Sequence, residues 1–180
     1  IPKGVFVITY FGRHISVKGY DILRKVGLKL LSRYPNVYIL CAGKGDLENP
    51  QHPRWIELGF INNVDDLLSQ SNLYILPNKE TYFDLITLQI LRAGIPLILS
   101  STGGNNYFKE LPKDMTKGLI YFDINNQEQV LEEMRRIMDL YEDDKIAYLE
   151  MGKSNRLLYE TYFTMSKYVE EYTNAIESLS

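Results

Sequence analysis

Two cations of different shape stand five residues apart in a short segment between glycines near the start of the chain. Arg13 and Lys18 lie in the stretch FGRHISVKGYD, which follows the apolar run GVFVITY and precedes a pattern of helical spacing. A guanidinium binds two phosphate oxygens at once, and an ammonium adds a compact point charge. The pair therefore suits a diphosphate. The alternative is that both are solvated loop cations, which are common on protein surfaces.

A second polar segment, KETYFDL, begins three residues after the end of the apolar run LYIL. We expect a helix from Phe83 to Ala93, whose first backbone N–H groups, on Phe83, Asp84 and Leu85, would attract an anion. Glu80 and Asp84 bring two carboxylates to this segment. The alternative for them is an acidic first turn that stabilises its own helix by about 0.3–1 kcal/mol.

The elements that must position these groups alternate between apolar runs and helical patterns. Six short, nearly continuous apolar runs are typical of strands buried on both faces of a sheet. They are Val5 to Tyr10, Val37 to Ala42, Trp55 to Leu58, Leu73 to Leu76, Leu97 to Ser100 and Leu119 to Phe122. Helical spacing predicts helices between and after them. These are Tyr20 to Arg33, Val64 to Ser69, Phe83 to Ala93 and Gln127 to Tyr141.

This order predicts the fold class α/β, with a doubly wound parallel sheet and right-handed crossovers. We assign residues 1–125 to the part that bears the sheet and residues 126–180 to a helical extension of the same domain. The extension is expected to break near residues 143–144 and again near residues 161–164. Ligands of such sheets bind outside the carboxyl ends of the strands, which is where both polar segments lie.

Composition limits the kinds of ligand. The 180 residues include 45% hydrophobic and 24% charged side chains, which is typical of one globular domain. A formal charge of −3 argues against an electrostatic grip on nucleic acid. No apolar run approaches the roughly 20 residues that cross a bilayer.

Residue types that hold metals are scarce. The chain has one cysteine, Cys41, which we expect to be buried in a strand, and two histidines, His14 and His52. They suggest no metal-ligand cluster, and we expect His14 to be an exposed loop residue. The chain begins at Ile1 without the pattern of a signal peptide. Because it does not begin with Met, we expect a piece of a longer chain.

The pattern of strand, Gly12-Arg13, four residues, Lys18-Gly19 and helix resembles the C-terminal domain of GT-B glycosyltransferases, especially the retaining family 4 enzymes. Similar motifs follow in the same order over about residues 5–123. They are AGKG after the second strand, LGF after the third, LLSQSNLYILP before the second polar segment, and GIPLI and TGG near the fifth strand. A single G-x-G turn is weak evidence, whereas the joint order identifies the chain as similar to this family.

The resemblance implies a Rossmann-like half of a GT-B fold that binds a nucleotide-sugar. Gly59 and Phe60 would meet the base. Gly103 and Gly104 would let the backbone approach the phosphates or the sugar, although they also suit a plain turn. The positions implied to bind the donor are Gly12, Gly59, Phe60, Thr81, Phe83, Asp84, Leu85, Gln89, Gly103 and Gly104.

The sequence departs from the family at its acidic motif. The family has two glutamates, one for the donor sugar and one for the ribose hydroxyls, at the positions of Thr81 and Gln89. Gln89 can still hydrogen-bond a ribose diol, whereas Thr81 carries no negative charge. Glu80, one residue early, is therefore the candidate for the acidic role. Asp84 replaces a usual glycine and would repel the phosphates unless it turned away.

The implied reaction moves a sugar from a nucleoside diphosphate, with UDP favoured, to a hydroxyl acceptor in surface polysaccharide or glycoconjugate synthesis. Arg13 and Lys18 would stabilise the charge that develops on the diphosphate, and Glu80 would act beside the sugar. No metal or other cofactor is expected. The acceptor site would lie on a missing N-terminal domain, which could also bring the protein to the inner face of the cytoplasmic membrane. Alone, the fragment should bind donor weakly and transfer nothing.

Three other functions stay open at this point. A sugar-nucleotide epimerase shares the GT-B fold but would need acid and base carboxylates. A non-catalytic or regulatory GT-B half would explain the substitutions at Thr81 and Gln89. A phospho-acceptor receiver also has a doubly wound sheet, but it needs an acidic cluster where Arg13 stands.

Overall fold

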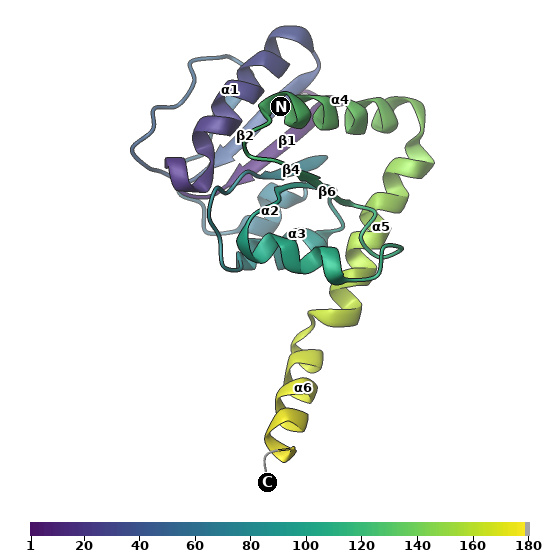
Figure 1. Cartoon of the computed structure of the whole chain (residues 1–180). Helices are drawn as coiled ribbons and strands as arrows, with labels where there is room; N and C mark the ends of the chain where they lie inside the picture. The colour runs from purple at the N-terminus through teal and green to yellow at the C-terminus, as the bar shows by residue number, and fades with distance from the viewer. Residues whose placement is uncertain (179–180) are drawn as a thin grey trace.

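Six parallel strands form the centre of the computed structural model, which describes residues 1–178 (Figure 1). Their order in the sheet is β3-β2-β1-β4-β5-β6. The strands are β1 (Phe6–Phe11), β2 (Val37–Ala42), β3 (Trp55–Glu57), β4 (Leu73–Leu76), β5 (Leu97–Ser100) and β6 (Leu119–Phe122). The predicted fold class is confirmed, and four of the six strands have the predicted bounds. The first strand lies one residue later than predicted, and the third ends one residue earlier.

Helices follow the strands in the predicted order. The α-helices are α1 (Tyr20–Arg33), α2 (Val64–Leu68), α3 (Leu85–Ala93), α4 (Gln127–Asp143), α5 (Lys145–Tyr162) and α6 (Met165–Glu177). Both predicted breaks in the helical extension are confirmed. Two 3-10 helices, η1 (Ser16–Lys18) and η2 (Gly103–Glu110), were not predicted. Residues 179 and 180 of the predicted extension lie outside the described residues.

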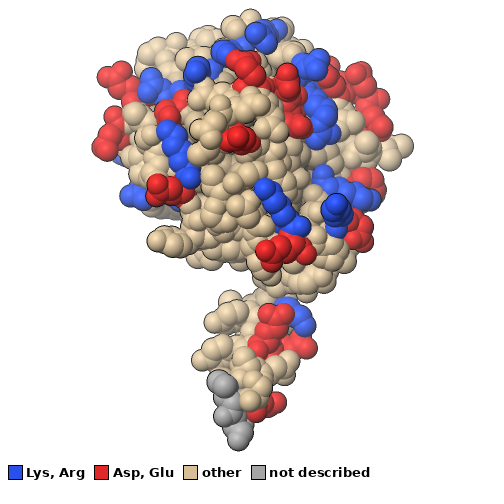
Figure 2. Space-filling view, viewed as in Figure 1, with Lys and Arg blue, Asp and Glu red and all other residues tan. Residues whose placement is uncertain are grey.

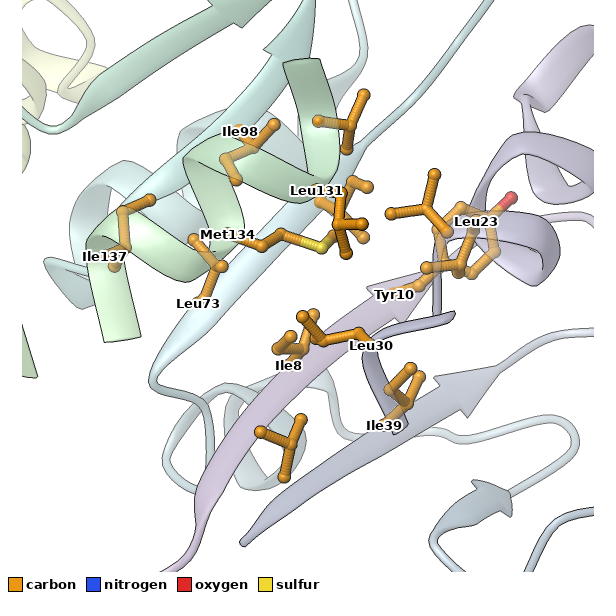
Figure 3. Close-up of a cluster of buried hydrophobic side chains, with 14 of the residues drawn as sticks. Ile8, Tyr10, Leu23, Leu30, Ile39, Leu73, Ile98, Leu131, Met134 and Ile137 are labelled. Carbon is orange, nitrogen blue, oxygen red and sulfur yellow. The ribbon is translucent and has the colours of Figure 1, made fainter. Parts of the chain in front are cut away.

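The sheet is covered on both faces. Helices α1 and α4 pack on one face, where Ile8 of β1 meets Leu30 of α1 and Met134 of α4 in the largest apolar cluster (Figure 3). Helices α2 and α3 cover the other face through two smaller clusters. This explains the continuous apolar runs, because residues pointing to either face of a central strand are buried.

The last two helices run away from the sheet. Helix α5 packs against both α3 and α4, and α6 then projects from the body of the molecule (Figure 1). Helix α6 buries none of its residues. Within the described chain, we find no helix with both the length and the apolar character needed to span a membrane.

The strand order places β1 beside β4 in the middle of the sheet, although their helices lie on opposite faces. The chain therefore leaves the two strands in opposite directions and opens a crevice between the loops that follow them. This switch point is the usual ligand site of a doubly wound sheet. Both polar segments of the sequence, after β1 and after β4, lie at this switch point.

Candidate functional site

The loops after β1 and β4 form a hollow at the switch point. Its larger part has a volume of about 540 Å³ and its smaller part about 250 Å³. Arg13, Lys18 and Asp84 line both parts, so we treat the two as one site and call it the switch-point pocket. The rest of its lining comes from the ends of β1 and β4, from the loops beyond them, and from Ile86 and Gly103.

A glycine holds the loop after β1 against the loop after β4. Gly19 ends η1 with a φ of 69°, in the left-handed region. A Cβ atom at this position would lie 1.8 Å from the carbonyl oxygen of Pro77, so the close approach requires glycine. The Gly19 that follows Lys18 in the sequence therefore brings the Lys18 side chain to the loop after β4.

Arg13 lines the pocket as an exposed side chain. Its backbone carbonyl accepts a hydrogen bond of 2.8 Å from the Tyr10 hydroxyl. Burial raises the pKa of Tyr10, so this hydroxyl stays protonated and keeps its donor role. No hydrogen bond or ion pair involves the Arg13 guanidinium within residues 1–178, and its donors are free to bind an anion.

Lys18 meets Asp84 across the pocket. The Lys18 Nζ atom lies 2.8 Å from Oδ1 of Asp84. The other carboxylate oxygen accepts hydrogen bonds from the Thr81 hydroxyl, at 3.1 Å, and from the buried side-chain amide of Asn78. We had expected Asp84 to repel phosphates unless it turned away. It does not turn away, because Lys18 and the two neutral donors hold it in the pocket.

Helix α3 begins at Leu85, so the prediction that Phe83 and Asp84 belong to its first turn is wrong. Asp84 is the N-cap residue with φ −87° and ψ 116°, and its side chain makes no cap hydrogen bond. The alternative of an acidic first turn is also wrong, because the first turn has no acidic residue. The Thr87 N–H donates to the Asp84 carbonyl, which leaves the N–H groups of Leu85 and Ile86 as the first at the helix end.

The side chains of Glu80, Thr81 and Phe83 reach the pocket in different ways. Glu80 is exposed and makes no hydrogen bond or ion pair to any described residue. Thr81 donates to Asp84, as described above. The ring of Phe83 packs 5.6 Å from that of Phe108 and 6.4 Å from that of Phe163, between centroids. Glu80 therefore offers an unpartnered carboxylate to the pocket, and its role beside the donor sugar stays a prediction.

The glycine pair after β5 serves a close contact within the protein. A Cβ atom on Gly103 would lie 1.8 Å from the Thr81 carbonyl oxygen, and one on Gly104 would lie 1.3 Å from that of Tyr82. The Gly104 N–H also donates to the Thr81 carbonyl at 3.0 Å. These glycines let the backbone of residues 81–82 approach, and their predicted approach to a ligand stays a prediction. Only Gly103 lines the pocket.

The loops after β1, β2 and β3 are joined by backbone contacts. The Gly12 N–H donates to the Ala42 carbonyl at 3.0 Å, and the Gly43 N–H donates to the Gly59 carbonyl at 2.7 Å. Gly59 lines a separate hollow of about 350 Å³ beside this junction. Phe60 follows with 77% of its side chain exposed. The base-binding role of Gly59 and Phe60 stays a prediction.

Gln89 and Leu85 do not line the switch-point pocket. Both lie in a groove of about 520 Å³ formed by α3, η2, α5 and α6, with Tyr159 and Tyr168 among its aromatic walls. The structure thus separates Gln89 from Arg13 and Lys18, with which we had grouped it. The ribose contact predicted for Gln89 stays a prediction.

His14 is buried, and the prediction of an exposed loop residue is wrong. Its ring stacks on that of Tyr20 with centroids 4.0 Å apart, and its Nδ1 lies 3.0 Å from Oδ1 of Asn49. Its Nε2 lies 3.8 Å from the Glu57 carboxylate, which also accepts a hydrogen bond from Tyr20. His14 therefore joins the loop after β1 to β3 and to the loop between β2 and β3.

Several residues that line the pocket were missed, and two of them shape it directly. Asn78, 1% exposed, fixes the Asp84 carboxylate, and Ile86 forms an apolar wall. Asn78 could have been found, because it follows the end of β4 by two residues, where parallel sheets bind ligands. The contact between Asn78 and Asp84 depends on the loop path and has no sequence signal.

Residues 5–140 match the model of the family "Glycosyl transferases group 1", and the chain belongs to this family. Its fold is that of the C-terminal half of a GT-B glycosyltransferase.

Several known proteins are similar to the chain. It is 28% identical over 174 residues to an uncharacterized glycosyltransferase of Haemophilus influenzae. The matched segment covers 92% of this chain and 47% of that protein. It is 25% identical over 171 residues to the O-antigen biosynthesis glycosyltransferase WclY of Escherichia coli, over 90% of this chain and 44% of that protein. The chain thus spans about half the length of the curated relatives it matches.

Solved structures show the same fold at low identity. HepE of Anabaena in complex with UDP superimposes with a TM-score of 0.78 at 13% identity, over 97% of this chain and 49% of that chain. The C-terminal domain of LpcC, a group 1 family protein of Francisella tularensis, superimposes with a TM-score of 0.73 at 14% identity, over 92% of this chain and 89% of that chain.

Proposed function

We propose that the switch-point pocket binds the diphosphate of a nucleotide-sugar, and that the chain supplies the donor half of a hexosyltransferase. The observation that carries this proposal is that Arg13 and Lys18 line one pocket with the residues that lead into α3. Two cations and a helix N-terminus at a switch point suit a diphosphate. The UDP complex of HepE, which has the same fold, supports UDP as the nucleotide.

The residues of the pocket suggest how transfer proceeds. As the bond between the sugar and the diphosphate breaks, negative charge grows on the departing oxygen while the acceptor hydroxyl attacks the sugar and passes its proton to the departing diphosphate. Arg13, Lys18 and the N–H groups of Leu85 and Ile86 would stabilise that charge. Glu80 would lie beside the sugar as the free carboxylate. We propose that this chemistry needs no metal, because protein cations serve the diphosphate.

The acceptor would bind outside this chain, because the curated relatives are about twice as long. We propose that a preceding domain carries the acceptor site and covers the exposed apolar face of α6, so that the fragment alone transfers no sugar. The similarity to WclY supports an acceptor in surface polysaccharide synthesis. The cytoplasm, at the inner face of the membrane, is the compartment that we propose for this work.

Calorimetric titration with UDP, GDP and ADP, in the presence of EDTA, tests the proposal. We expect one nucleotide to bind saturably, and both Arg13→Ala and Lys18→Ala to weaken it by at least about tenfold, because each removes a charged phosphate contact. Arg135→Ala and Lys113→Ala are matched controls, since both side chains are exposed and outside the pocket. Equal losses in the control variants would mean that net charge, and not the pocket, governs binding.

A second function is favoured by one contact. Asp84 pairs with Lys18 and so offsets the charge of one of the cations of the pocket, as a non-catalytic or regulatory GT-B half could tolerate. If no nucleotide binds the folded chain at millimolar concentration, this second function replaces the first for the isolated domain.

A further inference from the structure

We propose that Asp84 lowers the affinity of the switch-point pocket for a free nucleoside diphosphate more than for a nucleotide-sugar. The carboxylate would thereby favour donor over released product. This inference rests on the proposed function and adds a role for a residue that the nucleotide-binding pattern does not explain.

The Asp84 carboxylate is fixed in place. Oδ1 accepts from Lys18, and Oδ2 accepts from Thr81 and Asn78. Asn78 is held in turn, because its carbonyl accepts hydrogen bonds of 2.6 Å from Ser100 and 2.9 Å from Thr102. A carboxylate with three donors and a buried anchor does not swing away cheaply when an anion enters.

The backbone that carries Asp84 is also fixed. The close packing of Gly103 and Gly104 against the carbonyl groups of Thr81 and Tyr82 leaves residues 81–82 no room to move toward β5. Asp84 itself precedes α3 as the N-cap residue. The Asp84 side chain is therefore held at a fixed position in the pocket.

The charges around the pocket nearly cancel. Its lining holds three cations, Arg13, Lys18 and Lys79, and two anions, Glu80 and Asp84. A third anion, Asp21, lies 2.7 Å from Lys79. Lys18 is paired with Asp84 and Lys79 with Asp21, so Arg13 is the unpaired cation of the lining. The pocket therefore attracts each further negative charge less strongly than unpaired Arg13 and Lys18 side chains would.

A nucleotide-sugar and a free nucleoside diphosphate differ in charge at the phosphate that carries the sugar. A nucleotide-sugar has two negative charges on its diphosphate, whereas a free nucleoside diphosphate acquires close to a third above about pH 6. The extra charge sits on the phosphate that carried the sugar. A fixed carboxylate a few ångströms away disfavours one added charge by about three- to tenfold in affinity.

Calorimetry on the intact chain tests this inference at pH 8 and low salt. The ligands are UDP, UDP-glucose and the methyl ester of UDP, which lacks only the third charge. The proteins are the wild type, Asp84→Asn and Asp84→Ser, with Asp114→Asn as an exposed control outside the pocket. Asp84→Ser keeps a hydroxyl for hydrogen bonding, so it serves if the amide disturbs the loop.

We expect both Asp84 variants to bind UDP more tightly, and to shift the ratio of the UDP affinity to the methyl ester affinity by about three- to tenfold toward UDP. The control should leave this ratio unchanged. An unchanged ratio in the Asp84 variants, or equal weakening of all ligands, would overturn the inference and make Asp84 a support for Lys18. Weaker binding of UDP-glucose alone would also overturn it, since the carboxylate would then bind the sugar. Absence of any binding to all four proteins would refute the proposed function itself.

Discussion

Gly19 decides whether Lys18 can reach the switch-point pocket. We expect Gly19→Ala to destabilise the fold by at least about 3 kcal/mol, because a Cβ atom adds a clash with the Pro77 carbonyl to the cost of a left-handed backbone. Urea unfolding measures the loss. Gly4→Ala is a matched control, since Gly4 has a φ of 80° with open space around it. The control should cost only about 1–2 kcal/mol.

Equal losses in the two glycine variants would show that backbone conformation alone matters and that the packing of the loops is loose. A larger loss at Gly19, together with weaker nucleotide binding by the remaining folded protein, would link this contact to the site. The measurement thus separates strain from packing at two residues of the same type.

Single residues also show where prediction from sequence fails. The position and type of Arg13 and Lys18 were readable, because they stand in a motif next to a strand. The burial of His14 was not readable from the sequence, because it depends on contacts with Tyr20, Asn49 and Glu57, which come from three other segments. The pairing of Asp84 with Lys18 joins residues 66 positions apart, and no local pattern encodes such a contact.

At the scale of elements, Asn155 connects α5 to the sheet. Its side-chain amide donates to the carbonyl of Ile95, at 2.7 Å, and to that of Gly118, at 3.3 Å, just before β5 and β6. We expect Asn155→Ala to lower the free energy of unfolding by about 2–3 kcal/mol, because two buried carbonyl groups lose a donor. Thermal or urea unfolding of the variant provides the measurement.

Lys153→Ala is the control on the same helix, since Lys153 forms only an exposed pair with Glu150. It should change the stability by less than about 0.5 kcal/mol. If Asn155→Ala were as mild as this control, α5 would be held by its apolar contacts alone.

The strands and most helices were predictable because their signals are local. A central strand of a parallel sheet is apolar at every position, and α1 shows a clear helical stripe. The start of α3 was not predictable, because the side chain of Asp84 forms an ion pair with Lys18 and the helix begins only at Leu85. The helix η2 was missed because its Gly and Asn residues are typical of loops.

At the scale of the whole molecule, the distribution of charged side chains agrees with the small formal charge of −3 in the sequence. Figure 2 shows acidic and basic side chains interspersed over the visible face, with uncharged residues along one side of the projecting α6. The exposed apolar residues of α6 are Met165, Tyr168, Val169, Tyr172 and Ile176. Their spacing predicts an amphipathic helix, but nothing in the sequence shows that the rest of this domain leaves its apolar face uncovered.

The many buried tyrosines make the whole fold sensitive to alkali. Burial raises the pKa of five of them above the ordinary value of 10, and that of Tyr148 to about 12. The others are Tyr10, Tyr20, Tyr74 and Tyr121. Above pH 10 the unfolded chain loses these protons while the folded chain keeps them, so unfolding becomes more favourable as pH rises.

We therefore expect constant stability up to about pH 9.5 and a decline above pH 10 of up to about 1.4 kcal/mol per pH unit for each tyrosine. Urea midpoints at pH 9, 10 and 11 measure it. A flat profile to pH 11 would mean that these hydroxyls ionise in the folded protein, or that the chain opens locally around them.

The contact of Gly103 and Gly104 with residues 81–82 has a consequence for how such domains can change. The loop after β4 and the turn after β5 share one backbone interface, in which carbonyl groups occupy the volume of absent side chains. Neither segment can be exchanged alone. A donor loop grafted from a relative will fit only if its turn after β5 is grafted with it, so the two segments should be inherited, and engineered, as a pair.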